Sequence, residues 1–280
     1  MSQPARLGVC IIACNEERDL GRCLDSVAFA DEVLVVVDSR SRDATLRIAR
    51  EKGARVLCRA YEGNIEQKNA ALDALGDASE WVLSLDADEA LSPELAAAVQ
   101  AVLAGGSEGV AGFELGRATW HLGRWIRHGD FYPDWQLRLF RRGAHFSGVN
   151  PHGHVRVAGP VRRLPGDLAH YAYRDLSDQV ARIQAFSTVA SEARAPRRRF
   201  GMVWDLVTRP PARFLRGYLL KQGFRDGVAG FVIAAATAFH VFLKYAKEWE
   251  RSTVGACPAG RAAQGKVSRA AQERPEAPAP

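Results

Sequence analysis

The chain has 280 residues, of which 47% are hydrophobic and 25% are charged. This composition is ordinary for a globular protein and excludes a fibrous or largely disordered chain. Lys and Arg outnumber Asp and Glu by 38 to 32, which gives a net charge of +6, and arginines crowd residues 194–225. Such a basic segment suits phosphates, nucleic acid or an anionic membrane surface; the alternative is a solvated basic face.

The first hundred residues alternate between strand and helix signals. Apolar runs predict buried strands at Leu7–Ala13, Val33–Val37, Arg55–Cys58 and Trp81–Leu85. Helical spacing predicts helices at residues 20–27, 41–52 and 64–75, and a further helix with Ser92 as N-cap and Pro93 in its first turn. Because the strands are continuously apolar, we expect an α/β fold with a mainly parallel sheet covered on both faces.

From about residue 110 the pattern changes. Short strand-like pieces at residues 112–115, 136–140 and 154–157 predict a small antiparallel extension. Residues 175–194 have helical spacing, and the chain from Pro196 onward is basic and then apolar. Beyond about residue 251 almost no core residues remain, so we expect a disordered tail there.

The cysteines and the N-terminus indicate a cytoplasmic chain. The five cysteines are odd in number and form no Cys-x-x-Cys pair, so we expect reduced thiols rather than disulfides or a zinc site. The apolar run Leu7–Cys14 is short and ends at Asn15-Glu16-Glu17, without the cleavage pattern of a signal peptide.

Polar residues follow three of the predicted strands. Asn15, Asp38 and Asp86 each lie just past a strand's carboxyl end, where parallel sheets bind ligands. In Asp86-Ala87-Asp88, two carboxylates one residue apart suit a hard divalent cation that shares its shell with phosphates and stabilises a departing diphosphate. Asp-x-Asp alone is a common surface pattern, and its place at a strand end favours a functional site. Asp38 suits a base edge or a ribose, whereas Asp43 suits a helix cap.

Together these pieces resemble the family 2 glycosyltransferases, which have the GT-A fold. The resemblance spans about the first hundred residues and rests on four segments, Ile11–Glu17, Val37–Thr45, Gln67–Asn69 and Leu85–Glu89. It implies an inverting transfer from a nucleotide-sugar donor with the help of a divalent metal, Mg²⁺ or Mn²⁺. It also implies that Asp38 contacts the base, Asp86 the ribose or sugar, and Asp88 the metal. The residues implied to lie near the nucleotide are Asn15, Glu16 or Glu17, and Lys68.

Three later segments are similar to the branch of this family that includes lipopolysaccharide core glucosyltransferases. They are Tyr132–Arg142, Pro151–His154 and His170–Tyr173. This likeness favours a UDP-hexose donor and a glycolipid or lipopolysaccharide-type acceptor. The branch commonly has an acid where this chain has Gly153, which cannot act as general base. His152 is then the first candidate for the base and Asp134 the second, with His154 and Asp130 as further alternatives.

The C-terminal apolar stretch, residues 227–243, lies at the lower length limit for a membrane span and has basic residues on both sides. A helix in the plane of the membrane is our first interpretation, a buried core helix the second and a true span the third. We therefore expect a peripheral protein on the anionic inner face of the cytoplasmic membrane, without a nucleic-acid partner.

These inferences divide the chain into four parts. Residues 1–110 are expected to bind the nucleotide-sugar, residues 111–195 the acceptor, residues 196–250 the membrane, and residues 251–280 form the tail. Two rival functions stay open. A sugar-phosphate nucleotidyltransferase would need a Gly-rich, Arg-containing loop where this chain has Ala13-Cys14-Asn15-Glu16. A non-catalytic membrane protein that binds nucleotide-sugar without turnover would follow from the missing acid at Gly153.

Overall fold

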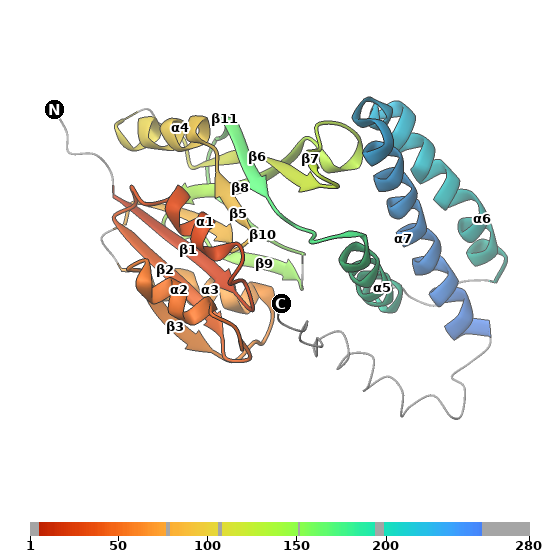
Figure 1. The fold of residues 1–280 in the computed structure, drawn as a ribbon, viewed down its shortest axis with the longest axis horizontal. Coiled ribbons are helices and arrows are strands. Elements are labelled where there is room, and N and C mark those ends of the chain that lie inside the picture. Colours follow the sequence, from red (N-terminus) through yellow and green to blue (C-terminus); the bar gives the residue numbers. More distant parts are fainter. Residues whose placement is uncertain (1–5, 77–78, 106–107, 151, 194–198, 254–280) are drawn as a thin grey trace, which may run out of the picture. The chain divides into compact units, whose positions relative to one another are not determined.

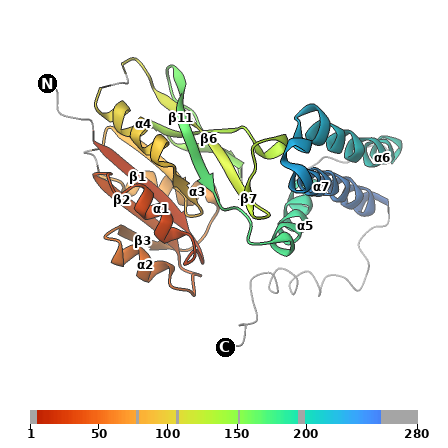
Figure 2. The same ribbon diagram turned by 45° about the horizontal axis from the view of Figure 1, so that its top comes forward.

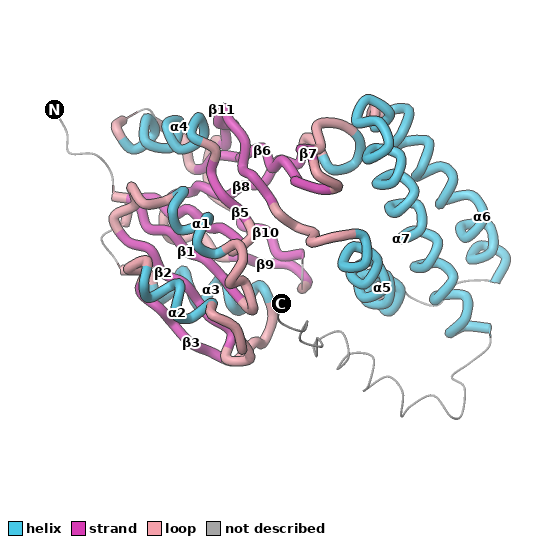
Figure 3. Tube along the Cα trace, viewed as in Figure 1, coloured by secondary structure: helices cyan, strands magenta, loops and turns pink. Residues whose placement is uncertain are grey.

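The computed structural model describes residues 6–76, 79–105, 108–150, 152–193 and 199–253 (Figure 1). The chain forms two compact units. The first, here the sheet unit, comprises Met1–Arg127 and Phe131–Ala172, and the second, here the helical unit, comprises His128–Asp130 and Tyr173–Pro280. Figure 3 shows the strands gathered in the sheet unit and long helices in the helical unit. Most of the expected tail, residues 254–280, lies outside the described residues.

The sheet unit is built on a nine-stranded sheet in the order β3-β2-β1-β4-β8-β6-β11-β5, with β7 on β6. Its first four strands are parallel. Strand β8 runs antiparallel to both β4 and β6, whereas β11 is parallel to β6. The strands are β1 (Leu7–Ala13), β2 (Glu32–Asp38), β3 (Arg55–Arg59), β4 (Trp81–Asp86), β5 (Glu89–Leu91), β6 (Gly112–His121), β7 (Arg124–Trp125), β8 (Asp134–Arg141) and β11 (Val161–His170). A separate hairpin pairs β9 (Phe146–Val149) with β10 (His152–Val155).

Helices cover both faces of the sheet, because the apolar strands turn alternate side chains to each side. One core joins β1, through residues such as Val9 and Ile11, to helices α1 (Leu20–Ser26), α2 (Thr45–Glu51) and α4 (Pro93–Leu103). The other core joins β1, through Cys10, to α3 (Asn64–Ala74) and the β9–β10 hairpin. Ser92 caps α4 by accepting a hydrogen bond from the Leu95 amide, as its sequence predicts. The predicted α/β class with a mainly parallel sheet is thus confirmed.

The second half of the sheet unit differs from its prediction in two places. The sequence indicated no strand at Val161–His170, because Pro165 and Gly166 interrupt its apolar pattern; the structure tolerates them at a shift of register against β6. The strand expected at residues 154–157 lies at His152–Val155 instead, because it pairs with β9 along that register. Long-range pairing decided both segments, which local patterns do not reveal.

The helical unit packs α5 (Leu176–Glu192), α6 (Arg199–Leu215) and α7 (Gly227–Thr253) together. Figures 1 and 2 both show α7 alongside α5 and α6. A π-helical turn, η2 (Arg216–Leu220), and a 3-10 turn, η3 (Gly223–Asp226), connect α6 to α7. A further 3-10 turn, η1 (Gly129–Phe131), begins in the helical unit and ends in the sheet unit.

Helix α7 contains the apolar stretch at residues 227–243. The segment Gly223–Ser252 is long and apolar enough to cross a membrane by length and composition. One side of it is buried within the helical unit, at Ala229, Ile233 and Ala234. In its second half, Lys247 Nζ donates to the Gln184 carbonyl of α5 at 2.7 Å, and Arg251 donates to Ser191 Oγ at 2.5 Å. These polar contacts hold the C-terminal half of α7 against α5.

Candidate functional site

The edge of the sheet at which β1, β2 and β4 end collects most of the residues singled out from the sequence. Because β8 is antiparallel to β4, its first residue, Asp134, lies at this same edge. Strand β6 runs parallel to β4, and β11 runs parallel to β6, so His170 at the end of β11 lies there as well. The topology thus brings Asn15, Asp38, Asp86 and Asp134 to one edge.

Asp38, the last residue of β2, is held as a carboxylate by Arg40. Arg40 Nη2 and Nε donate to Asp38 Oδ2 at 2.6 and 3.0 Å, and the Arg40 amide donates to Oδ1 at 2.9 Å. Burial alone would raise the pKa of Asp38, but these hydrogen bonds hold it below its ordinary value. The Arg40 guanidinium in turn lies over the Tyr61 ring, 4.8 Å from its centre. Asp38 is therefore a fixed, ionised hydrogen-bond acceptor.

Asn15 and Glu17 brace the loop after β1 against the loop after β2. Asn15 has a left-handed backbone with φ of 56°, and its Oδ1 accepts a hydrogen bond from the Arg42 amide at 2.9 Å. Its own amide donates to Ser41 Oγ at 2.9 Å. Glu17 Oε2 accepts from the Ala44 amide at 2.9 Å. In this structure, the predicted donor-binding residues Asn15 and Glu17 therefore use side-chain oxygens to shape the loops around Asp38.

Asp86, the last residue of β4, lies between two cations. Its Oδ1 is 2.7 Å from Lys68 Nζ of α3, and its Oδ2 is 2.6 Å from Arg138 Nη2 of β8. Burial alone would raise the pKa of Asp86, but Lys68 and Arg138 hold it well below its ordinary value. Burial also lowers the pKa of Lys68, and the attraction of Asp86 offsets only part of that change.

The pairing continues through the interior as an alternating series. Arg138 Nη2 contacts Glu89 Oε1 at 2.7 Å, Arg117 Nη1 contacts the same oxygen at 3.3 Å, and Arg117 Nη2 contacts Asp134 Oδ2 at 2.5 Å. Glu89 is buried, and its Oε2 accepts a hydrogen bond from the Asp86 amide at 2.9 Å. The ion-pair chain is hereafter this set of six: Lys68, Asp86, Arg138, Glu89, Arg117 and Asp134. It connects Lys68 and Asp86, two of the predicted donor-binding residues, to Asp134, the second candidate base.

Asp88 faces a histidine that was not predicted as a site residue. Asp88 Oδ2 lies 3.6 Å from His170 Nε2, and the Tyr171 amide donates to the Asp88 carbonyl at 2.9 Å. Within the described residues, no group of three or more His, Cys, Asp or Glu side chains could hold a metal ion. One carboxylate with one imidazole instead fits a divalent ion that takes its remaining ligands from substrate phosphates and water. His170 ends β11, the strand that the sequence pattern did not reveal.

The candidate bases lie on different elements. His152 begins β10, and its side chain lies outside what the structure describes. Its neighbour Gly153 packs against Ile65 in the first turn of α3. Both carboxylate oxygens of Asp134 accept hydrogen bonds. Arg117 donates to Oδ2, and Gln136 Nε2 donates to Oδ1 at 2.6 Å. The structure therefore gives Asp134 a structural role at the end of the ion-pair chain.

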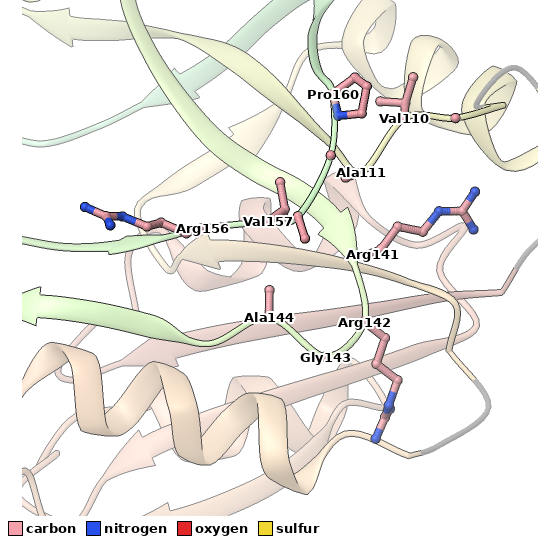
Figure 4. Close-up of a pocket in the computed structure, with 12 residues that line it drawn as sticks. Val110, Ala111, Arg141, Arg142, Gly143, Ala144, Arg156, Val157 and Pro160 are labelled. Atoms are coloured by element: carbon pink, nitrogen blue, oxygen red, sulfur yellow. The ribbon is translucent and has the colours of Figure 1, made fainter.

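One cavity lies elsewhere in the sheet unit. It has a volume of about 540 Å³ and opens where β8 ends and β6 and β11 begin, at the edge opposite Asp86. Its basic residues are Arg141, Arg142 and Arg156, whose side chains point in different directions (Figure 4). They do not converge on a common point as an anion site would require, so this cavity is not the candidate donor site.

Comparison with known proteins decides the family. Residues 8–163 match the sequence profile described as Glycosyl transferase family 2. The chain belongs to this family. This family 2 glycosyltransferase is 29% identical to "Lipopolysaccharide core biosynthesis glycosyltransferase LpsC" of Rhizobium meliloti (strain 1021), over 90% of this chain and 95% of that protein. It is 27% identical to the uncharacterized glycosyltransferase RT0209 of Rickettsia typhi, over 88% of each. Among solved structures it is similar to S. aureus TarS 1–349, with 15% identity, a TM-score of 0.44, and coverage of 90% of this chain and 93% of that one.

Proposed function

We propose that this family 2 glycosyltransferase moves a hexose from a UDP-hexose donor to lipopolysaccharide core or a lipid-linked glycan, with inversion at the sugar. The observation that carries the proposal is the position of Asp38, Asp86 and Asp88 at one edge of the sheet in a chain of this family. The similarity to a lipopolysaccharide core glycosyltransferase from Rhizobium meliloti supports the class of acceptor.

In this proposal, the donor lies across the ends of β1, β2 and β4. Asp38, fixed by Arg40, accepts hydrogen bonds from the base or ribose, and Asp86 orients the ribose or sugar. Lys68 offers a cation to the diphosphate from a position 2.7 Å from Asp86. Asp88 and His170 hold a Mg²⁺ or Mn²⁺ ion, which when bound supplies positive charge beside the leaving diphosphate.

Inversion requires a base on the side of the sugar opposite the leaving diphosphate. We assign this role first to His152, since an imidazole with an ordinary pKa near 6.5 suits proton uptake at neutral pH. Asp134 is the second candidate, and its side chain accepts hydrogen bonds from Arg117 and Gln136.

If the acceptor is anchored in a membrane, the enzyme must reach the membrane surface, and the C-terminal part of the chain suits this task. We propose that residues 196–250 bind the anionic inner face of the cytoplasmic membrane. The arginines of this segment and its apolar helix α7 support such binding.

A donor screen tests the transferase. It measures free nucleoside diphosphate released from UDP-hexoses, with and without Mg²⁺ or Mn²⁺, in the presence of membrane lipid as acceptor. Acceptor-dependent release of UDP is expected. Pyrophosphate released from a nucleoside triphosphate and a sugar phosphate would instead reveal a nucleotidyltransferase. Binding of the donor without any turnover would reveal a non-catalytic protein.

A further inference from the structure

The turn that connects α6 to α7 presents an aromatic surface. Tyr218 lies at its centre, with ring-centre distances of 5.4 Å to Phe214, 6.3 Å to Phe224 and 5.8 Å to Phe231. Phe214 and Phe231 also meet edge to face at 5.6 Å. These four residues, Phe214, Tyr218, Phe224 and Phe231, are hereafter the aromatic tip. All belong to the helical unit, and the two most C-terminal rings are about half exposed, at 48% and 50%.

Aliphatic side chains extend this surface into solvent. Leu220 is 79% exposed and Val228 is 81% exposed, with Leu215 and Leu219 about half exposed beside them. A monomeric protein in water rarely exposes several large apolar residues on one short connection, because each costs free energy in contact with water. Such a surface therefore indicates a binding partner that can receive apolar side chains.

Basic residues surround the same turn. Residues 209–225 contain five Lys or Arg and no Asp or Glu. The buried Asp130 carboxylate balances part of this charge, since its Oδ1 lies 3.2 Å from Lys221 and 3.4 Å from Arg213. Arg216 and Arg225 are exposed. An apolar centre within a basic rim matches an anionic bilayer, in which apolar side chains enter the interface and cations meet lipid phosphates. A second copy of the same surface would bring like charges together.

From these observations we infer that the α6–α7 turn, led by the aromatic tip together with Leu220 and Val228, inserts into the interface of an anionic lipid bilayer. This inference rests on the proposed binding of residues 196–250 to the membrane. It narrows the membrane-binding part of that segment to the surface of the α6–α7 turn. It also differs from the interpretations of α7 as a helix in the plane of the membrane or as a span. In this inference, α7 approaches the membrane by its N-terminal end. The C-terminal end of α7 stays on α5 through Lys247 and Arg251.

Vesicle binding by matched double variants of the full chain tests this surface. Leu220→Ser/Val228→Ser removes the two most exposed apolar side chains of the turn. Val180→Ser/Phe186→Ser is the control, since both residues lie on α5 of the same unit and are 51% and 42% exposed. The vesicles contain phosphatidylethanolamine and phosphatidylglycerol and no glycolipid, so that any binding is to the bilayer and not to an acceptor.

The turn variant is expected to bind these vesicles at least about tenfold more weakly, with the control unchanged. Arg216→Gln/Arg225→Gln is expected to weaken binding most at low salt, because screening already reduces the electrostatic part at high salt. Equal binding by the turn variant and wild type would overturn the inference. A turn-dependent dimer in sedimentation velocity without vesicles would also overturn it, in favour of a second copy as the partner.

Two further measurements separate this inference from the transferase itself. Circular dichroism and thermal unfolding confirm that each variant is folded. UDP release with a water-soluble acceptor fragment, measured without vesicles, is expected to be the same for the turn variant and wild type. A wild-type protein that binds vesicles through the turn but releases no UDP would refute the transferase and leave the inference standing.

Discussion

Ile65 and Gly153 pack so closely that a β-carbon on residue 153 would lie 2.5 Å from Cγ1 of Ile65. The resemblance to the lipopolysaccharide core branch leads us to expect an acid at this position, and here Ile65 fills the space that its side chain would need. Ile65 of α3 and Gly153 of β10 therefore fit each other as a pair.

Gly153→Asp is accordingly expected to destabilise the protein by about 1–3 kcal/mol, the usual cost of overpacking. Ile65→Ala/Gly153→Asp is expected to recover part of this loss, because the shorter side chain makes room. Urea unfolding of the wild type, both single variants and the double variant measures the coupling. Additive effects of the two substitutions would contradict the close contact.

Asp88→Asn is expected to lower the rate of transfer by about a hundredfold or more, because it removes a charged ligand of the proposed metal ion, which would stabilise the charge that develops on the leaving diphosphate. Excess EDTA should act similarly on the wild type. UDP release at saturating donor measures both effects. Asp25→Asn, a substitution at an exposed carboxylate paired with Lys52, is the control and should keep full activity. Full activity of Asp88→Asn would remove Asp88 from the proposed metal site.

Arg138→Ala is expected to lower the free energy of unfolding by about 3–5 kcal/mol, because it leaves Asp86 and the buried Glu89 without their shared cation. Arg163→Ala removes an arginine from an exposed pair with Glu114 and should cost less than about 1 kcal/mol. Chemical denaturation compares the two. Similar small losses would show that the ion-pair chain contributes little to stability.

His152→Ala is expected to lower kcat by about a hundredfold or more while donor affinity stays nearly unchanged, as the loss of a general base would require. Asp134→Asn should lower kcat less. Turnover is measured at saturating donor and nucleotide binding by calorimetry. Near wild-type turnover of His152→Ala would remove His152 from the mechanism, and an Asp134→Asn protein that still binds donor but is inactive would transfer the role to Asp134.

Stability should depend on pH through Asp38 and Asp86, whose pKa values in the folded state lie below the ordinary value of 3.8. As the pH falls below 3.8, the unfolded chain takes up protons on these carboxyls before the folded chain does. Their contribution is therefore complete above pH 3.8 and is lost as the pH falls toward the lowered values. In urea unfolding across this pH range, the free energy of unfolding should decline less steeply with falling pH for Asp38→Asn than for the wild type. Equal slopes for the two proteins would contradict this role of Asp38.

The strands that carry the predicted donor-binding residues were predictable from local sequence. Continuous apolar runs end at Ala13, Asp38 and Asp86, and a parallel sheet brings such ends together whatever the rest of the chain does. The same reasoning could not find Arg138, Glu89 or Arg117, because their roles come from pairing across β4, β5, β6 and β8. No local pattern shows that a buried arginine on one strand will meet an aspartate 52 residues earlier.

The position of His170 and the buried side of α7 could not be predicted for a different reason. The strand that carries His170 contains Pro165 and Gly166, and its pairing with β6 and β5 outweighs their poor strand preference. The sequence predicted a helix for the apolar stretch of α7. Which of its sides is buried depends on the packing of α5 and α6. Composition alone did not separate a core side from an exposed one.

Helix α3 contacts both the proposed donor site and the hairpin that carries the first candidate base. Lys68 contacts Asp86 on the donor side, and the next residue, Asn69, exchanges two hydrogen bonds with the backbone of Phe146, at 3.0 and 2.8 Å, in the hairpin that carries His152. A donor diphosphate that draws Lys68 away from Asp86 therefore pulls on a helix that is clamped to that hairpin. We therefore expect occupancy of the donor site to affect the position of His152, the first candidate base, so substitutions in α3 that touch neither substrate should change KM and kcat together.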